Sequence, residues 1–331
     1  MKVLVTGAEG FIGSHLVEKL ILLGAKVRAL KQYHFQNYDG CLENLSENIL
    51  KKIEIVSGDI RDPFETNLSV KGCDSVINLA ALIGIPYSYK APKNYVDTNI
   101  IGTVNILEAA RKNDVKKIIL TSTSEVYGSA QQIPIKENHP LNAQSPYAAT
   151  KIASDFMGLS YYFSYKTPVI LLRPFNTFGP RQTGRAIIPS ILLQVMKDQK
   201  VIKLGNLLPT RDFVYVDDTV DAFVNALKSK KKLYGNVFNI CSGREVSVGK
   251  ICQIIKKITK KNFVIEVNKE RVRAKSSEVN RLLGDNSKAK KYLNWKPRYA
   301  SSTGFLNGLK KTIEWFSKNE NLSKYKKIYN I

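Results

Sequence analysis

The sequence predicts an α/β protein in which helices wind around both faces of a mostly parallel sheet, followed by a smaller C-terminal α+β lobe. Short β-branched runs alternate with longer amphipathic stretches over the first two-thirds of the chain, and strands separated by helices form βαβ crossovers. Apolar runs such as 118–120 suit strands that are buried on both faces of a sheet. A glycine-rich segment follows the first β-branched run directly, as in many strand-to-helix turns of such folds.

The expected elements of the first part of the chain follow this alternation in order. Strands are expected at Lys2–Thr6, Lys26–Leu30, Ile53–Ser57, Ser75–Leu79, Lys117–Thr121 and Val169–Arg173. Helices, with apolar residues at helical spacing, are expected at Phe11–Leu23, Asn94–Asn113 and Pro146–Tyr165. Residues 1–174 should therefore form the main part of the wound domain.

The pattern changes after Pro174, and residues 175–331 are expected to form the smaller lobe, interleaved with late strands of the sheet. Its expected helices are Ile187–Lys197, Val216–Ser229 and Val248–Thr259, and its expected strands are Val237–Asn239 and Val264–Glu266. Such a lobe would lie across the carboxyl ends of the strands, where open α/β sheets bind ligands. The polar tail from Lys318 onward is expected to fray.

The composition is globular but strongly basic. The 331 residues include 51 Lys plus Arg against 28 Asp plus Glu, a formal charge of +23. A polyanion, an acidic membrane surface or a phosphorylated small molecule could each be attracted by this charge. The charge could equally reflect a composition bias that places lysines on solvated faces. The lysine clusters at 228–232 and 256–261 are not interleaved with aromatic residues, so a nucleic-acid partner is not predicted.

Cysteine spacing and hydropathy indicate a soluble cytoplasmic protein without a metal site. The cysteines form no CxxC pair, which predicts neither a zinc site nor a disulfide framework; they are Cys41, Cys73, Cys241 and Cys252. No stretch approaches the ~20 apolar residues of a membrane-spanning helix. Residues 1–6 form an apolar run too short for a signal-peptide core.

The segment from Gly7 to Gly13 indicates a Rossmann-type nucleotide site. Its GxxGxxG spacing would let Gly7 form the tight turn, Gly10 admit a pyrophosphate and Gly13 pack helix against strand. Phe11 and Ile12 then begin a helix whose N-terminus faces the anion. Residues 1–174 are therefore expected to bind a dinucleotide.

The end of the second strand leaves the choice between NAD and NADP open. An acid normally binds the adenosine ribose of NAD at this place, but here the residue is Lys31. Lys31 could pair with the 2′-phosphate of NADP, or it could be a solvent-facing lysine.

Together with the later Tyr147-Ala-Ala-Thr-Lys151, this glycine segment resembles the extended short-chain dehydrogenase/reductase family. Further matches occur in register at Gly58–Asp62, Leu79–Ala81, Asn99 and Arg173–Asn176. The resemblance implies a nicotinamide cofactor, tightly bound and recycled in each turnover. It also implies a homodimer formed through the helices at 94–113 and 146–165. The cofactor contacts that it implies beyond the glycines are Asp59, Ile60, Leu79, Ala80, Ala81, Asn99, Tyr147 and Lys151.

Tyr147 and Lys151 are the candidate proton-transfer pair. They lie four residues apart on an expected helix and project from one face. A phenol has an ordinary pKa of about 10, but a nearby ammonium and a positively charged nicotinamide would favour phenolate. Tyr147 is then a credible base for a sugar hydroxyl.

Thr123, Ser124 and Glu125 follow the strand at 117–121, where the nicotinamide should sit. The resemblance gives Thr123 the hydroxyl that binds the reacting sugar oxygen. The Thr-Ser-Glu triplet resembles that of GDP-mannose 4,6-dehydratases, in which a carboxylate assists water elimination. The resemblance implies that Glu125 has this role here, and that Ser124 or Glu125 protonates the leaving hydroxyl. Glu125 could instead only cap the turn.

The resemblance also implies that the later part of the chain binds a nucleotide-diphosphate sugar. The implied substrate contacts are Asn176, Arg185, Arg211, Arg273 and Glu278, in which arginines suit a diphosphate and a carboxylate suits a ribose diol. The two downstream arginines and the glutamate could instead form internal salt bridges.

Residues 80–89, read with the Ser-Thr-Ser-Glu-Val-Tyr-Gly segment at 122–128, most resemble LegB-type 4,6-dehydratases. These enzymes act on GDP-N-acetylglucosamine in legionaminic acid biosynthesis, a glycan pathway. Ile85, Pro86 and Tyr87 would line the sugar pocket, although Ile85 could equally belong to a packed loop. The expected function is nucleotide-sugar 4,6-dehydration, a lyase reaction. A 4-epimerase on the same scaffold and a non-catalytic cofactor-binding regulatory protein are the alternatives.

Overall fold

A seven-stranded parallel sheet forms the centre of the molecule in the computed structural model, which describes residues 1–268 and 277–325. The strand order is β10-β6-β5-β4-β1-β2-β3. Its strands are β1 (Lys2–Thr6), β2 (Lys26–Lys31), β3 (Ile53–Ser57), β4 (Ser75–Asn78), β5 (Lys117–Thr121), β6 (Val169–Pro174) and β10 (Asn236–Ile240). The predicted doubly wound parallel sheet is confirmed.

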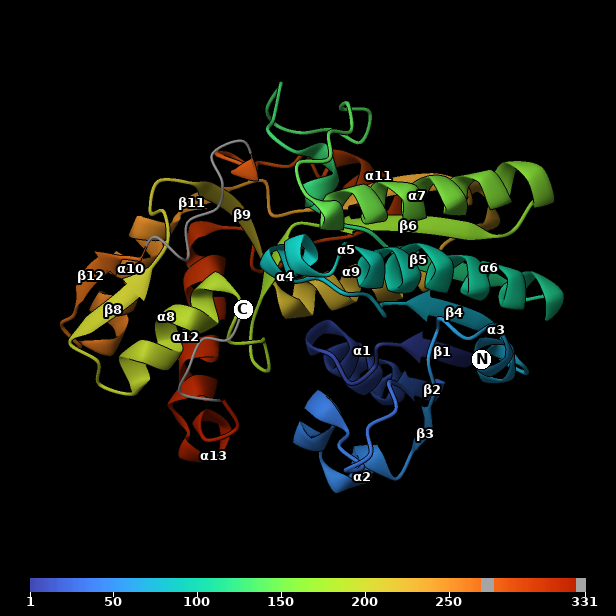
Figure 1. Cartoon of the computed structure of the whole chain (residues 1–331), viewed down its shortest axis with the longest axis horizontal. Helices are drawn as coiled ribbons and strands as arrows, with labels where there is room; N and C mark the ends of the chain where they lie inside the picture. Colours follow the sequence, from blue (N-terminus) through green and yellow to red (C-terminus); the bar gives the residue numbers. More distant parts are fainter. Residues whose placement is uncertain (269–276, 326–331) are drawn as a thin grey trace.

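Helices cover both faces of this sheet (Figure 1). One face carries α1 (Phe11–Leu22) and α9 (Val216–Lys228), and the other carries α3 (Pro63–Val70), α6 (Gly102–Lys112) and α7 (Pro146–Tyr165). Alternate strand residues serve the two sides, so that Val3 and Val5 pack with the first set and Leu4 with the second. Burial on both faces explains why the strands are continuous apolar runs.

A smaller lobe lies beside the wound domain, at the left of Figure 1. It contains α8 (Ile187–Met196), α10 (Val248–Thr259), α12 (Ser302–Ser317), the sheet β11-β9-β7 and the strand pair β12-β8. Four of its strands escaped prediction: β7 (Asn176–Phe178), β8 (Val201–Leu204), β9 (Thr210–Tyr215) and β11 (Glu245–Ser247). Three of these are only three or four residues long, too short to show a period. The remaining strand, β12, is Val264–Val267.

The predicted helix at 94–113 is interrupted. It consists of α5 (Pro92–Tyr95), a π-helical turn (Val96–Ile101) and α6. The carbonyl oxygen of Asn99 accepts hydrogen bonds from the hydroxyls of Thr103 and Ser154, each 2.6 Å long. Side-chain donors that insert into the helical hydrogen-bond ladder in this way distort it.

The remaining helical segments are short. They are α2 (Glu47–Leu50), α4 (Ile85–Lys90), α11 (Ser287–Leu293), α13 (Asn319–Leu322) and 3₁₀ turns at Gly40–Asn44, Ser124–Tyr127 and Lys231–Leu233.

The tail is packed against the protein as far as the structure describes it. The Tyr325 ring packs against Trp315 and Phe316, and its hydroxyl donates to the carbonyl of Gln182. The prediction of a frayed tail is thus wrong for residues 318–325. Within residues 1–268 and 277–325, no helix has the length and hydrophobicity needed to span a bilayer.

Candidate active site

The predicted site residues come together at the carboxyl ends of four neighbouring strands. β1 leads into the glycine turn, β4 into Leu79–Ala81, β5 into Ser122–Glu125, and β6 into the loop that carries Asn176. Because all four strands are parallel and adjacent, these segments meet along one edge of the sheet, where ligands of open α/β folds bind.

The glycine turn is shaped by two close backbone approaches. Gly7 has a φ of +61°, and a Cβ there would lie 2.8 Å from the amide nitrogen of Ala80. A Cβ on Gly13 would lie 2.2 Å from the carbonyl oxygen of Gly7, so only glycine permits this packing. A Cβ on Gly10 would meet only that carbonyl, at 3.1 Å. No side chain among the described residues caps the N-terminus of α1, which suits a phosphate ligand at Phe11 and Ile12.

Lys31 is neither solvent-facing nor unpaired. Its side chain is almost completely buried at the end of β2. Its Nζ lies 2.5 Å from Oδ1 of Asp39 and donates to the carbonyl of Tyr38. The interpretation of Lys31 as a solvent-exposed residue is therefore wrong, and its charge is already balanced inside the protein.

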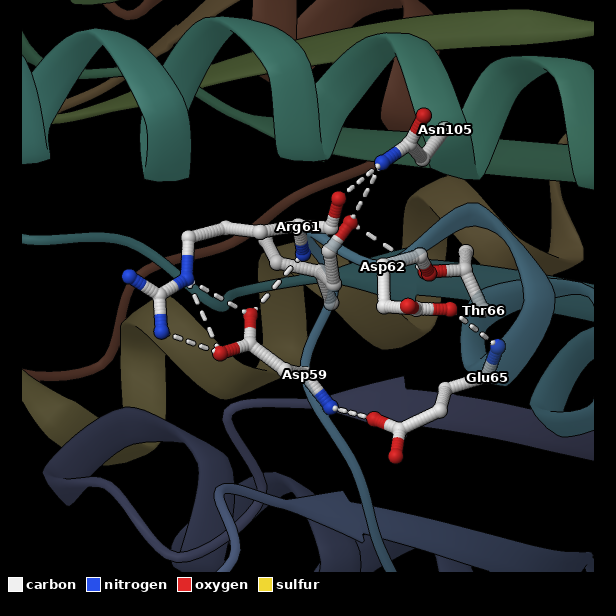
Figure 2. A network of polar contacts seen from close by, with 7 residues as sticks. Asp59, Arg61, Asp62, Glu65, Thr66 and Asn105 are labelled. Atoms are coloured by element: carbon white, nitrogen blue, oxygen red, sulfur yellow. Dashed lines mark hydrogen bonds and ion pairs between the residues drawn. The ribbon is translucent and has the colours of Figure 1, made fainter.

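Asp59, the residue expected to bind adenine, lies in a polar network before α3 (Figure 2). Its carboxylate accepts hydrogen bonds from Nε of Arg61 at 2.9 and 3.0 Å, and its amide donates to Glu65 at 2.7 Å. The bonds from Arg61 lower the pKa of Asp59, so it stays an ionised acceptor. The carbonyl of Ile60 accepts from Asn105. The adenine contact itself stays a prediction.

Asn99 holds the loop after β4 in place rather than pointing free into the site. Its amide donates to the carbonyl of Leu82 and to the hydroxyl of Thr150, and accepts from the amide of Leu82. The amide nitrogens of Leu79 and Ala80 donate to the hydroxyl of Thr6. The segment Leu79–Leu82 is therefore fixed against both β1 and the π-helical turn.

Tyr147, Lys151 and Thr123 form one cluster. Ser145 caps α7 by accepting a hydrogen bond from the amide of Ala148, which places Tyr147 in the first turn. The Tyr147 phenol is hydrogen-bonded to the Thr123 hydroxyl. One helical turn later, Lys151 Nζ donates to the carbonyl of Thr121. Tyr147 and Lys151 are both buried.

Burial shifts both proton-transfer candidates toward their neutral forms. It lowers the pKa of Lys151 to about 8, against an opposing effect of Asp155. It raises the pKa of Tyr147, as does the charge of Glu125, whereas the hydrogen bond from Thr123 lowers it. The protein by itself therefore disfavours phenolate, and a cationic ligand near Tyr147 would be needed to reverse this balance.

Ser124 and Glu125 lie in the 3₁₀ turn that follows β5. The turn is capped by Thr123, whose hydroxyl accepts from the amide of Glu125 at 3.2 Å. The side-chain cap at the start of this turn is thus Thr123. Ser124 is buried and Glu125 half-buried.

Ile85 lies beneath Tyr147 in a small apolar cluster. Ile85, Tyr95 and Tyr147 are buried together, with Tyr87 packed against them. The rings of Tyr95 and Tyr147 meet edge to face, with centroids 6.3 Å apart. Pro86 occupies the first turn of α4. Arg185 is exposed but lies near enough to Tyr95 for its charge to act on that phenol.

The predicted nucleotide contacts are only partly assembled. Asn176 lies on β7. Arg211 on β9 forms an ion pair with Glu278, with 3.3 Å between Nη2 and Oε1, so these two predicted ligands contact each other. Arg273 lies outside the described residues.

Two residues of the site were not predicted, Tyr95 and Asp155. Asp155 lies one turn beyond Lys151 on α7, and its charge raises the pKa of both Tyr147 and Lys151. The spacing Tyr147, Lys151, Asp155, four residues each, was the available signal for a third residue on that face. Tyr95 gave no such signal, because its position depends on the interrupted helix.

Several buried polar atoms at this edge have no hydrogen-bond partner within the described part of the chain. They are Glu9 Oε2, Thr121 Oγ1, Ser122 Oγ and Asn176 Oδ1. A buried polar group without a partner costs about 1–3 kcal/mol. Polar ligands at the ends of β1, β5 and β6 would satisfy these atoms, which fits a dinucleotide and a sugar substrate.

Comparisons with known proteins agree with this geometry. Residues 4–307 match the family model described as GDP-mannose 4,6 dehydratase. The chain is 36% identical over 329 residues to a putative UDP-glucose 4-epimerase of Methanocaldococcus jannaschii, covering 96% of this chain and 99% of that protein. It is 31% identical over 340 residues to the dTDP-D-glucose 4,6-dehydratase of Homo sapiens, covering 96% and 90%.

Solved structures give the same result. The dTDP-glucose 4,6-dehydratase of Streptomyces venezuelae, determined with NAD bound, superposes with a TM-score of 0.87 at 27% identity and covers 98% of this chain and 99% of that one. The UDP-N-acetylglucosamine 4-epimerase of Methanobrevibacter ruminantium gives a TM-score of 0.84 at 30% identity, covering 95% and 97%. The chain therefore belongs to the extended short-chain dehydrogenase/reductase family of nucleotide-sugar dehydratases and epimerases.

Proposed function

We propose that this protein is a nucleotide-sugar 4,6-dehydratase, which converts an NDP-hexose to the 4-keto-6-deoxy sugar. Glu125 carries this proposal. It lies on the turn after β5, near enough to Tyr147 for its charge to raise the pKa of the phenol. Epimerisation at C4 requires one base and one hydride acceptor, whereas elimination of water requires a further proton-transfer group beside them.

The cofactor in this proposal is NAD or NADP, held by the glycine turn, Leu79–Ala81, Asp59 and Ile60. When bound, it would accept hydride from C4 and return it to C6. Lys151 would bind its ribose and, together with the nicotinamide charge, favour the phenolate of Tyr147. Tight binding follows from the recycling of hydride within one turnover, since no net oxidation occurs.

The remaining steps belong to this chain's own residues. Tyr147 accepts the proton of the C4 hydroxyl, while Thr123 orients that oxygen. Glu125 removes the C5 proton, which the C4 carbonyl makes acidic. The C6 hydroxyl leaves as water with a proton from Glu125 or through Ser124. After hydride reaches C6, a proton returns to C5, so that the sum is the loss of one water.

The substrate is proposed to be a nucleotide-diphosphate hexose, with GDP-N-acetylglucosamine as the first compound to test because of the segments at 80–89 and 122–128. Ile85, Pro86 and Tyr87 would line the sugar pocket, and Arg185, whose charge acts on the neighbouring Tyr95, would add a cation to it. Asn176, Arg211 and Arg273 would bind the diphosphate and Glu278 the ribose. Binding would then separate Glu278 from Arg211.

A second candidate is a 4-epimerase, which the relatives themselves support. Proteins named as UDP-glucose 4-epimerases, one of them putative, are 36% and 35% identical to this chain over almost its full length. In an epimerase Glu125 would not be needed for turnover.

The test is a panel of GDP-, UDP-, dTDP- and CDP-hexoses, analysed by mass spectrometry. A dehydratase yields a product lighter by one water, and Glu125→Gln abolishes it. The matched control is Glu47→Gln, which removes an exposed carboxylate on α2 that lies 3.9 Å from the ammonium of Lys51. A product of unchanged mass and altered stereochemistry would establish the epimerase. No product from any sugar would favour a cofactor-binding regulatory protein.

We also propose a homodimer through the helical segment 92–112 and α7. Both expose large apolar side chains, Ile101 on the first and Phe156 and Phe163 on the second, with exposed fractions of 45%, 57% and 64%. Light scattering should give twice the chain mass, and Phe156→Glu combined with Phe163→Glu should give the monomer mass.

A further inference from the structure

The end of β2 lacks the acid that normally binds the adenosine ribose of NAD, because Lys31 occupies that position. A carboxylate nevertheless lies there. Glu9, between Gly7 and Gly10 of the glycine turn, directs its side chain to the residue that follows β2. Its Oε1 accepts a hydrogen bond of 3.0 Å from the amide of Gln32.

The position of Glu9 is fixed by the loop that precedes α2. Its carbonyl accepts a hydrogen bond of 2.8 Å from the amide of Cys41. Gly40, with a φ of +60°, passes so close that a Cβ on it would lie 2.9 Å from Cβ of Glu9. The side chain of Glu9 is thus held beside the end of β2, where an acid on that strand would bind the adenosine ribose.

The second oxygen of this carboxylate is unsatisfied. Oε2 is buried and has no hydrogen-bond partner within residues 1–268 and 277–325. Burial raises the pKa of Glu9, and the amide of Gln32 and the charge of Lys31 offset only part of this rise. A hydroxyl donor would satisfy the unpartnered oxygen, and the bond is charge-assisted when the carboxylate is ionised.

The charges around Glu9 oppose a phosphate. Lys31 is the cation that acts on Glu9, and it is already paired with Asp39. Glu43 accepts from the amide of Asp39 and adds a further negative charge. Arg61, on the loop after β3, is likewise held by Asp59. A 2′-phosphate would meet carboxylates without an unpaired partner among these cations.

We propose that Glu9 accepts a hydrogen bond from the 2′-hydroxyl of the adenosine ribose, in place of an acid on β2, and that Glu9 and the Lys31–Asp39 pair together select NAD over NADP. This inference rests on the proposal that the chain binds a nicotinamide dinucleotide, but not on which reaction follows.

The test measures binding without catalysis. Isothermal titration of the nucleotide-free full-length protein compares ADP-ribose, 2′-deoxy-ADP-ribose and 2′-phospho-ADP-ribose, none of which carries nicotinamide. Removing the 2′-hydroxyl should weaken binding about tenfold to a hundredfold, as for a hydrogen bond to a charged group. The 2′-phosphate should weaken it by at least as much.

Glu9→Gln should weaken ADP-ribose binding about tenfold, reduce the difference between ADP-ribose and its 2′-deoxy form by the same factor, and improve binding of the 2′-phosphate. Glu54→Gln is the control, because it removes a carboxylate on β3 that pairs with Lys2 and Arg28. It should leave the relative affinities for the three ligands unchanged. If Glu9→Gln does not fold, the three ligands on the unmodified protein still decide the question.

Equal affinity for ADP-ribose and its 2′-deoxy form would overturn the role of Glu9. Tighter binding of the 2′-phosphate, lost in Lys31→Gln, would assign Lys31 to NADP instead. Absence of binding by all three ligands would contradict the cofactor expectation as well, and so separates failure of this inference from failure of the proposed function.

Discussion

Asp155 on α7 and Arg173 on β6 form an ion pair from which water is almost completely excluded. Nε of Arg173 lies 2.9 Å from Oδ2 of Asp155, and the two side chains are 4% and 3% exposed. Arg173 also donates to the hydroxyl of Tyr127, which in turn donates to Asn239 on β10. The pair therefore joins α7 to the sheet and fixes a negative charge one helical turn behind Lys151.

Breaking this pair should strongly destabilise the fold. Asp155→Asn leaves the Arg173 charge buried without its partner, and we expect a loss of about 3–5 kcal/mol in the free energy of unfolding, measured in urea. The double variant Asp155→Leu with Arg173→Leu should lose less than either single leucine variant, since no unpaired charge is left. A change below about 1 kcal/mol in Asp155→Asn would show that the pair contributes little.

Lys151 should make the free energy of unfolding rise with pH in the alkaline range. Burial lowers its pKa to about 8 in the folded protein, whereas the unfolded chain keeps the proton to about pH 10.4. Between these values the unfolded state binds more protons, so the free energy of unfolding rises with pH. Relative to Lys151→Met, the natural protein should gain about 2–3 kcal/mol between pH 8 and 10.

The comparison with Lys151→Met is made by urea unfolding at fixed ionic strength. Other titrating groups, such as the tyrosines, are present in both proteins and cancel in the difference. A difference that stays constant from pH 8 to 10 would mean that the pKa of Lys151 is not lowered by burial.

Thr123 should lower the pKa of Tyr147, the proposed catalytic base. The hydrogen bond from Thr123 lowers the pKa of Tyr147, so Thr123→Val should raise that pKa by about one unit. The acidic limb of the kcat profile should move to higher pH by the same amount, with about a tenfold lower kcat at pH 7. Thr259→Val on α10, whose hydroxyl bonds the carbonyl of Ile255, is the control. An unshifted limb would assign Thr123 a role in substrate binding alone.

Gly13→Ala should damage both the fold and the cofactor site. The added Cβ would lie 2.2 Å from the Gly7 carbonyl, and overpacking of this kind typically costs about 1–3 kcal/mol. Dinucleotide affinity should fall as the glycine turn shifts. Gly249→Ala, in the first turn of α10, is the matched control, because its Cβ would have no neighbour closer than 3.6 Å. Equal stability of the two variants would contradict the tight packing at Gly13.

The sequence predicts the wound sheet well because most of its first six strands are short apolar runs buried on both faces, as β1, β4, β5 and β6 are. The ends of those strands agree with the structure to within one residue, as at Ser75–Asn78 and Val169–Pro174. The second lobe was harder to predict. β7 and β11 have three residues each, and their pairing with β9 depends on contacts between segments far apart in the chain.

The sequence by itself determined the parallel sheet and the glycine turn, because short-range spacing and strand ends specify them. Its resemblance to a known family added the candidate residues Thr123, Glu125, Tyr147 and Lys151. Only the tertiary structure decided the state of the charged residues. Lys31 is buried against Asp39, Arg211 pairs with Glu278, and Arg173 pairs with Asp155. Whether a charge meets a partner or a ligand depends on segments that approach through folding, and local sequence carries no record of that approach.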